Sequence, residues 1–349
     1  MAENNHIHVE LSSTSILKAI LLVLFFILLY LLRDILIVFL FAIIVASAVS
    51  PFVTWLEKRG LPRLLAVILI YLVVFGLFVF VLSLVIPFAS SDLSQLTTFF
   101  PRIVEQLSSS LEDAQQGAPE YFDFVGEIQN LLETLSSYLQ QISQSAVNLI
   151  VSIFGGVFSF IAIVIISFYL SVMRNGIESF LTSVLPQKYE GYAISLWKRS
   201  EVKVGRWLQG QLLLALIVGL IVYIGLSLMG IRFALIFAIL AMALEIVPIA
   251  GPILAAIPPV ILAFLEDPTL GLWVVLFYIL VQQFENHILV PLIIGKSTGL
   301  NPVVVILALL IGGKLGGIIG AIIAVPIATV IVEVFDDLAK HKEETKRVT

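Results

Sequence analysis

The sequence predicts an all-α polytopic membrane protein with about eight transmembrane helices, some of them discontinuous, and an extracellular helical hairpin insertion. Of the 349 residues, 60% are hydrophobic and only 12% are charged, whereas roughly a quarter of the residues in soluble domains are charged. The mean hydropathy is +1.11. Apolar runs of the roughly 20 residues needed to cross a bilayer recur along the chain. These three observations indicate a multi-pass membrane protein.

Eight apolar runs are long enough to count as crossings. They are Ile16 to Leu32, Ile35 to Trp55, Leu64 to Ile86, Val147 to Val172, Leu208 to Gly230, Phe233 to Leu265, Leu270 to Ile294 and Val303 to Val332. Only Arg33 and Asp34 separate the first two, so the alternative is one long kinked element, which would change the number of crossings. The start of the chain lacks the basic region of a cleaved signal, and we expect the first run to be retained.

Charge in the connecting segments predicts the orientation of the chain. The loop Glu57 to Arg63 carries three bases against one acid, and the segment Arg174 to Arg206 carries six against three. Short loops rich in Lys and Arg face the cytoplasm. The segment Pro87 to Ala146 has one base and eight acids and is expected to face outward. We therefore predict a multi-pass membrane protein with cytoplasmic N- and C-termini.

The same features divide the chain into parts. The parts are membrane helices 1 to 3 in 1–86, the acidic extracellular insertion in 87–146, membrane helices 4 to 8 with a cytoplasmic hairpin at 175–206 in 147–335, and a cytoplasmic tail in 336–349. The insertion breaks at Gly117-Ala118-Pro119 and continues with an amphipathic helical stripe. It is either a vestibule or association surface, or a solvated hairpin that covers the membrane domain.

The stretch EIVPIAGPILAAIPPVI, residues 245 to 261, places four prolines and one acid in an apolar run. Each proline lacks an amide donor and displaces the carbonyl four residues earlier, and unpaired backbone at membrane depth is tolerated only inside protein or at a wet cavity. We expect the helix to unwind around Pro248 to Pro252, helped by Gly251, with Glu245 at the edge of the break. Such a site suits a hard cation, a proton or a hydroxyl-rich solute. The alternative is a kinked structural helix.

Polar residues recur in the next apolar run. Gln282, Glu285 and Asn286 share one helical face at i, i+3 and i+4, and Gln283 lies beside them in the chain. Charged residues within a span usually face a cavity or a partner, so we expect this stripe to meet Glu245 across a pathway. The alternative is that the cluster lies at the interface with water.

The last run contains GGKLGGIIGAIIAVP, residues 312 to 326. Small residues four positions apart let helix backbones approach, and their density also permits a break. We expect five glycines to serve helix packing or gating: Gly312, Gly313, Gly316, Gly317 and Gly320. Lys314 is a candidate partner for Glu245 or Glu285, because an ion pair would neutralise the buried charge.

An internal repeat would align the two interrupted runs. When Gly230 is set against Gly299, Glu245 falls opposite Lys314. The repeat would be parallel, with the site between the interrupted halves. Chance matches in so apolar a chain are the alternative.

Several kinds of chemistry have no support in the sequence. The chain has no cysteine and its four histidines are scattered, so we predict neither a metal site nor a cofactor. The GKST stretch at 295–298 lacks the upstream glycine of a phosphate loop, and no serine nucleophile elbow occurs. We predict that the protein is not an enzyme and does not bind nucleic acid.

Several short motifs along the chain are distinctive of one family: Arg33-Asp34, Ser50-Pro51, Gly205-Arg206-Trp207, Gly210-Gln211, EIVPIAGP, QQFENHILVPLIIGKSTGLNP and the glycine-rich end. In these motifs the chain resembles the autoinducer-2 exporter (AI-2E) family of bacterial and archaeal membrane proteins, which implies a location in the prokaryotic plasma membrane. The resemblance also implies eight spans with an outer insertion, a homo-oligomer for which a pentamer is one candidate, and either export of small signalling molecules or sodium(lithium)/proton exchange. Ile249 and Asn301 depart from the usual residues of the family, so the resemblance does not identify the substrate.

The leading hypothesis is a secondary transporter that exports a small polar solute, such as an autoinducer-2-like signalling molecule, coupled to an ion gradient. In this hypothesis Glu245, with Glu285 as second candidate, alternates between a protonated form and an ion- or substrate-bound form. A sodium(lithium)/proton antiporter is the first alternative. A membrane scaffold or a channel is a further one. The expected partners are the solute, Na⁺, Li⁺ or H⁺, and the lipid bilayer.

Overall fold

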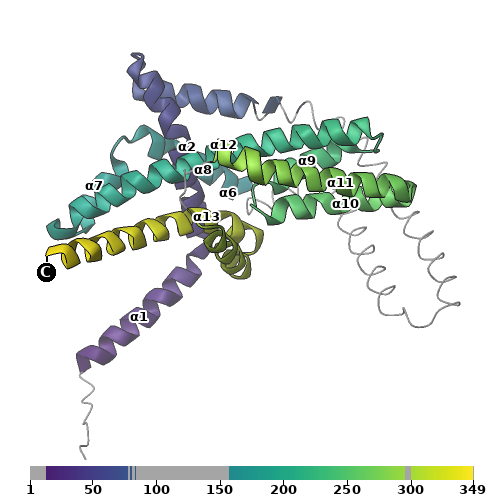
Figure 1. Ribbon diagram of the computed structural model, residues 1–349. Helices are drawn as coiled ribbons and strands as arrows, with labels where there is room; N and C mark the ends of the chain where they lie inside the picture. Colours follow the sequence, from purple (N-terminus) through teal and green to yellow (C-terminus); the bar gives the residue numbers. More distant parts are fainter. Residues whose placement is uncertain (1–12, 78, 81–82, 84–156, 295–299, 349) are drawn as a thin grey trace, which may run out of the picture.

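The computed structural model describes residues 13–77, 79–80, 83, 157–294 and 300–348, and all regular structure in these ranges is helical (Figure 1). By length and composition, four helical stretches of the described residues could cross a membrane: Arg33–Lys58, Gln187–Leu228, Pro268–Ile293 and Pro302–Lys340, the last of which has a break at Gly316 and Gly317. The prediction of an all-α polytopic membrane protein is therefore confirmed. The predicted outer insertion at 87–146 and the GKST stretch lie outside the described residues.

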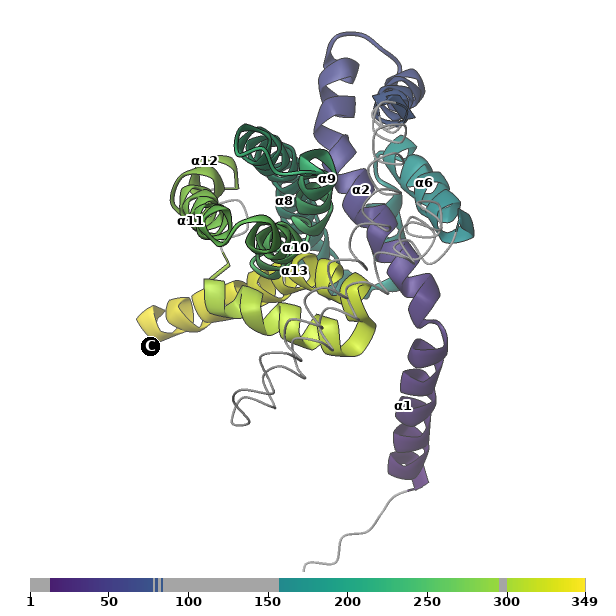
Figure 2. The ribbon, with the colours of Figure 1, turned by 90° about the vertical axis from the view of Figure 1, so that its right-hand side faces the viewer.

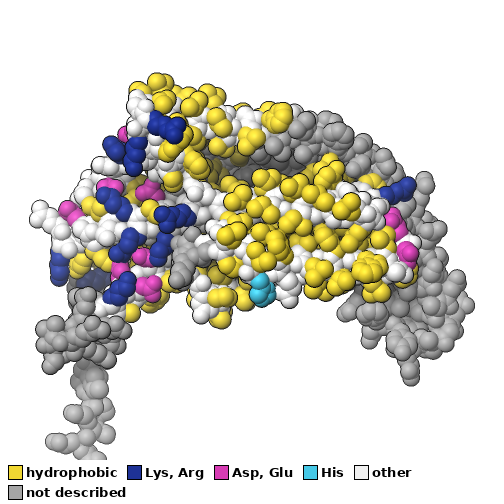
Figure 3. Space-filling view, turned by 45° about the horizontal axis from the view of Figure 1, so that its top comes forward, with side chains coloured by type: hydrophobic (Ala, Val, Ile, Leu, Met, Phe, Trp, Pro, Cys, Tyr) yellow, Lys and Arg dark blue, Asp and Glu magenta, His cyan; other side chains and the backbone are white. Residues whose placement is uncertain are grey.

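Charged side chains gather at one end of the molecule, and a broad apolar surface separates them from a few charges at the opposite end (Figure 3). Exposed apolar residues such as Leu276, Ile279 and Leu280 contribute to this surface. Large exposed apolar patches mark contact with a membrane or another protein. The distribution fits a protein whose middle lies in lipid.

The first two predicted crossings are joined end to end. Helix α1 (Ser13–Leu31) and helix α2 (Arg33–Lys58) meet at Leu32, where helical hydrogen bonds continue from Leu32 N to Leu28 O and from Leu36 N to Leu32 O, both at 2.9 Å. Helix α1 leaves the end of α2 without reversing direction (Figure 1). This geometry favours the alternative of one long kinked element.

Helix α2 packs with the helix Arg63–Leu77 and with α6 (Val157–Val172) around buried Val53 and Val67. The Arg63 guanidinium donates to the carbonyls of Ser171 and Val172, at 2.9 and 3.1 Å. These carbonyls end α6 and have no helical partner. The basic loop predicted from the sequence therefore ties the ends of these helices together.

Helix α8 (Gln187–Leu228) is a single helix of 42 residues that follows the short helix α7 (Gly176–Val184). It is about 63 Å long at ~1.5 Å per residue, so its polar first half and its apolar second half form one continuous rod. Pro186 is its N-cap. At Gly205 a Cβ would lie 2.3 Å from the Ser47 carbonyl oxygen, so α2 and α8 cross there in backbone contact.

The crossing predicted at 233–265 is a pair of short helices. Helix α9 (Ala234–Leu244) and helix α10 (Ala250–Glu266) are joined by a turn at 245–249 and pack against each other and against α8 and α11. They measure about 16 and 26 Å, less than the ~30 Å hydrocarbon core. The prediction of one crossing was wrong here, because the helix stops at 245 and the chain turns back as a hairpin.

Helix α11 (Pro268–Phe284), the π-helical turn η2 (Glu285–Leu289) and α12 (Val290–Ile293) form the next span. The Asp267 carboxylate accepts from Thr269 N at 2.7 Å, and Pro268 occupies the first helical position, as is common at helix starts. The hydrophobic core between α8, α9, α10 and α11 includes Leu214, Val222, Phe237, Leu262 and Val274.

The last predicted crossing is also folded. Helix α13 (Pro302–Val348) has non-helical backbone at Gly316 and at Gly317, whose φ of 61° favours glycine. The first arm, 302–315, is about 21 Å long, too short to cross the bilayer. The two arms of α13 lie side by side (Figure 2). The predicted single crossing at 303–332 is thus a second hairpin, and eight crossings are not confirmed.

The two arms of α13 touch through glycines. A Cβ on Gly312 would lie 2.4 Å from the Gly320 carbonyl oxygen, whereas a Cβ on the neighbouring Gly313 would have no atom within 4 Å. We expect Gly312→Ala to destabilise the protein by about 1–3 kcal/mol through overpacking and Gly313→Ala to be neutral or stabilising by up to about 1 kcal/mol. Thermal unfolding of both variants in detergent tests this. Equal melting temperatures would show that the arms do not depend on this contact.

An ionic cluster joins the second arm of α13 to the first half of α8. Glu333, only 8% exposed, pairs with Arg199 at 3.0 Å and with Lys203, and Asp337 also pairs with Arg199. Ion pairs at the surface add little to the stability of a protein. A partly buried acid that contacts two bases adds more. The cluster fixes the α13 hairpin against α8.

Removing the central acid of this cluster should weaken the hairpin. We expect Glu333→Ala to lower the free energy of unfolding by about 1–2 kcal/mol, between the values for exposed and buried pairs. Asp336→Ala is the matched control, since Asp336 is exposed three residues away. Thermal unfolding at low and high salt measures the difference. If the difference in stability between the two variants is the same at low and at high salt, the ion pairs are not its cause.

Candidate functional site

Glu245 lies where α9 ends, and its side chain is buried with 1% of its surface exposed. The break falls at 245–249, earlier than the predicted Pro248 to Pro252, and Gly251 and Pro252 belong to the first turn of α10. The Leu244 carbonyl, which was expected to be free, accepts from Val247 N at 2.9 Å. A tighter turn thus replaces the helical hydrogen bond that Pro248 removes.

The tip of the hairpin has a strained backbone. Ile249 has φ 67° and ψ −55°, and Ala250 N donates to the Pro248 carbonyl at 2.7 Å. This is a γ-turn of the rare, strained form, at a β-branched residue that seldom adopts positive φ. Phe233, at the start of α9, also has positive φ, 63°. Strain of this kind clusters at functional sites and switch regions.

Gly251 lets the two helices of the hairpin meet. A Cβ at this position would lie 1.9 Å from the Leu244 carbonyl oxygen. No side chain larger than hydrogen fits without moving the backbone of one helix. Gly251 was predicted to help the helix unwind. In the structure it lies just after the break, where it allows α9 and α10 to pack closely.

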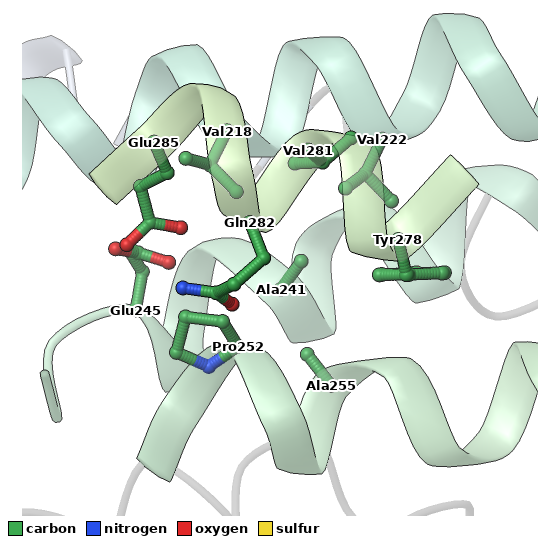
Figure 4. Close-up of a pocket in the computed structure, with 10 residues that line it drawn as sticks. All are labelled: Val218, Val222, Ala241, Glu245, Pro252, Ala255, Tyr278, Val281, Gln282 and Glu285. Carbon is green, nitrogen blue, oxygen red and sulfur yellow. The ribbon is translucent and has the colours of Figure 1, made fainter. Parts of the chain in front are cut away.

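Glu285 is the acid that faces Glu245. It is 4% exposed and begins η2, and single π-helical turns inside α-helices are frequent at functional sites. The two carboxyl groups point toward each other (Figure 4). Of the polar stripe that was expected to meet Glu245, Glu285 lies opposite it, and a pathway between them stays a prediction.

A small cavity lies beside the two acids. Its lining comes from α8, α9, α10, α11 and η2 and consists of Val218, Val222, Ala241, Glu245, Pro252, Ala255, Tyr278, Val281, Gln282 and Glu285 (Figure 4). It has room for about one water molecule. The lining contains two carboxyl groups and no base.

Four buried side-chain oxygens in this region have no hydrogen-bond partner. Three of them belong to residues that line the cavity, Oε2 of Glu245, Oε2 of Glu285 and Oη of Tyr278, and the fourth is Oε1 of Gln211, whose Nε2 donates to the main-chain carbonyl oxygen of Glu245. Leaving a buried polar group unpaired costs about 1–3 kcal/mol, and more for a charged one. Such an oxygen-rich, acidic cavity can hold a proton or a small hard cation, which prefers oxygen ligands.

The structure does not bring all predicted residues to the cavity. Gln282 lines it and donates to Asn286 Oδ1 at 3.4 Å, while Asn286 and Gln283 are exposed. Lys314 is exposed on α13, and the ion pairs of the described residues do not include it. The predicted lysine partner of the acids is thus not observed.

Two residues of this region were absent from the predicted site. Tyr278 precedes Gln282 by one helical turn, so the polar stripe of α11 could have been extended to it. Gln211 appeared only within a motif of the resemblance. Gln211 is a buried polar residue on the apolar face of α8 that packs against the core. The sequence alone does not show which face of α8 is buried, so it did not single out Gln211.

The relatives of this chain among known proteins are named as transport proteins. The YueF protein of Bacillus subtilis, whose name describes a transport protein, is 30% identical over 275 residues, covering 76% of this chain and 73% of YueF. The AI-2 transport protein TqsA of Escherichia coli is 26% identical over 285 residues, covering 81% and 80%. The YhhT protein of E. coli, also named as a transport protein, is 26% identical over 285 residues, covering 81% and 78%.

The family model described as the AI-2E family transporter matches residues 19–340, which is most of the chain. The match includes the α9–α10 hairpin, the acidic pair and both arms of α13 up to 340. The resemblance noted in the sequence is confirmed. The chain belongs to the AI-2E family of membrane transporters.

Proposed function

We propose that this transporter is a secondary transporter of the prokaryotic plasma membrane that exports a small polar solute, such as an autoinducer-2-like molecule, coupled to an ion gradient. The single observation that carries the coupling is the buried pair Glu245 and Glu285 beside a cavity without a base. The name of the E. coli relative TqsA supports the class of solute.

The acidic pair is suited to carry the coupling ion. Two carboxylates that lie together in a low-dielectric interior repel each other, and burying both charges is costly. A proton shared between Glu245 and Glu285, or a small cation bound to both, removes that cost. A site that takes either one, but not both at once, exchanges them across the membrane when access alternates.

The α9–α10 hairpin is the element proposed to move. It is shorter than the bilayer is thick, and its tip carries Glu245. Backbone strain lies at Phe233, just before α9, and at Ile249, just before α10. Hinges are a few terminal residues that absorb backbone rotation. Ion binding at the tip would favour one hairpin position, because it neutralises the two acids only when they face each other.

Sodium(lithium)/proton exchange is the second candidate, and the size of the cavity favours it. Space for about one water admits a proton or a dehydrated ion but not a polyhydroxylated solute. In the export proposal the solute therefore binds in another conformation or along another part of the pathway, while the acidic pair handles the ion.

A flux assay in proteoliposomes tests both proposals. The purified protein is reconstituted with a pH-sensitive dye inside the vesicles, and sodium, lithium or a candidate polyhydroxylated solute is added outside. Proton movement on a sodium or lithium pulse alone supports the antiporter. Proton-coupled flux that requires the solute supports export. Neither flux in vesicles that contain folded protein would contradict a role as an ion-coupled transporter.

A further inference from the structure

Gln211 connects α8 to the hairpin tip. Its side chain is 2% exposed, and its Nε2 donates to the main-chain carbonyl oxygen of Glu245. In a continuous helix that oxygen would accept from the amide of residue 249, but Ile249 has the strained conformation of the tip. The donor that the hairpin lacks is therefore supplied by α8.

This hydrogen bond fixes the other end of the Gln211 amide. A main-chain carbonyl can only accept, so the group that faces Glu245 O must be the NH₂. The carboxamide is planar, and Oε1 is thereby held in one direction. Oε1 is buried and has no hydrogen-bond partner among the described residues.

Acceptors outnumber donors around the acidic pair. Oε2 of Glu245, Oε2 of Glu285 and Oε1 of Gln211 are buried acceptors without a partner among the described residues. The hydroxyl of Tyr278 can donate one proton, and Nε2 of Gln282, which lines the cavity, keeps one N–H after its hydrogen bond within its own helix. Two donors cannot pair all three oxygens. A positive charge among them can satisfy several oxygens at once.

We infer that Gln211 is a positioning residue that also supplies a neutral oxygen ligand to a small cation bound at the acidic pair. Nε2 holds the hairpin tip against α8, and Oε1 faces the ion. The inference rests on the proposed coupling site and adds to it a ligand from a third segment of the chain. Gln211 therefore contributes to the affinity of the site for sodium or lithium.

The test measures cation binding by the full-length protein in detergent. A ligand that binds only the folded protein raises the unfolding temperature in proportion to its occupancy, so titrations with sodium and lithium give a midpoint concentration. In Gln211→Met the shape of the side chain is retained but both polar atoms are lost. We expect its midpoint to rise about tenfold, as for the loss of groups that support an ion's ligands.

Gln209→Met is the matched control. Gln209 lies two residues away on α8, and its Nε2 donates to the Ala48 carbonyl at 2.6 Å, so this variant loses the same kind of interhelical hydrogen bond. We expect it to lower the unfolding temperature without changing the cation midpoint. An equal effect of the two variants on the midpoint would overturn the inference.

A second variant, Gln211→Glu, tests the inference even if Gln211→Met does not fold. Its protonated carboxyl group can donate to Glu245 O and still present an oxygen, so we expect a midpoint close to that of the unsubstituted protein. A midpoint weakened tenfold in this variant would contradict the assigned role.

Two results separate this inference from the proposed function. A cation effect that is lost in Glu245→Gln but unchanged in Gln211→Met overturns the role of Gln211 alone. The absence of any sodium or lithium effect on the unsubstituted protein overturns both the cation ligand and the cation form of the coupling site.

Discussion

Replacing Glu245 with glutamine should reduce ion-coupled flux by about 100-fold or more, the lower range for loss of a positioned proton-transferring group. The amide has nearly the same shape as the carboxyl group but cannot exchange a proton or neutralise a cation. Flux in proteoliposomes measures the loss. Because the substitution removes a buried charge without changing the volume, folding should be preserved, and size-exclusion chromatography checks this.

Two further variants serve as a control and as a conservative substitution for Glu245→Gln. Glu266→Gln removes an exposed acid at the end of α10 and should leave flux unchanged. Glu245→Asp keeps the carboxyl group but shortens its reach toward Glu285, so an intermediate flux is expected. If Glu245→Gln transports at the rate of the unsubstituted protein, the acidic pair does not carry the coupling ion.

The second large effect is expected from Gly251→Ala. The added Cβ would lie 1.9 Å from the Leu244 carbonyl oxygen and 2.6 Å from its carbon, so α9 and α10 must separate at the tip. Overpacking of this kind costs about 1–3 kcal/mol, and the displacement moves Glu245 away from Glu285. We expect both a lower unfolding temperature and loss of flux.

Gly191→Ala provides the comparison for this variant. Gly191 lies within α8, and a Cβ there would have no atom within 4 Å. Alanine is a better helix former than glycine, so the substitution should stabilise the protein by about 0.5–1 kcal/mol with normal flux. Normal flux in Gly251→Ala would show that transport does not depend on close contact at the hairpin tip.

Part of the candidate site could be predicted from residue types alone. An acid and four prolines within one apolar run make an unbroken, lipid-facing helix costly, and the run does break next to Glu245. The polar stripe with Glu285 in the next run was expected for the same reason. Both acids do face each other, because each avoids lipid and they share one interior.

The position and direction of the break depended on contacts that the sequence does not display. Proline excludes a continuous helix but does not say whether the chain goes on or turns back. The positive φ of Ile249 and the glycine contact between Gly251 and Leu244 make it turn back. The same holds for α13, where the run of glycines allowed either a packed helix or a fold at Gly317.

The sequence by itself determined that this is a helical, multi-pass membrane protein with buried acids at interrupted helices, because hydropathy and proline act locally. Only the tertiary structure decided that two predicted crossings are hairpins, that Lys314 stays away from the acids, and that Gln211 reaches the carbonyl of Glu245. These outcomes depend on which side chains from distant segments meet. Such meetings are set by packing between helices and leave no periodic pattern in the chain.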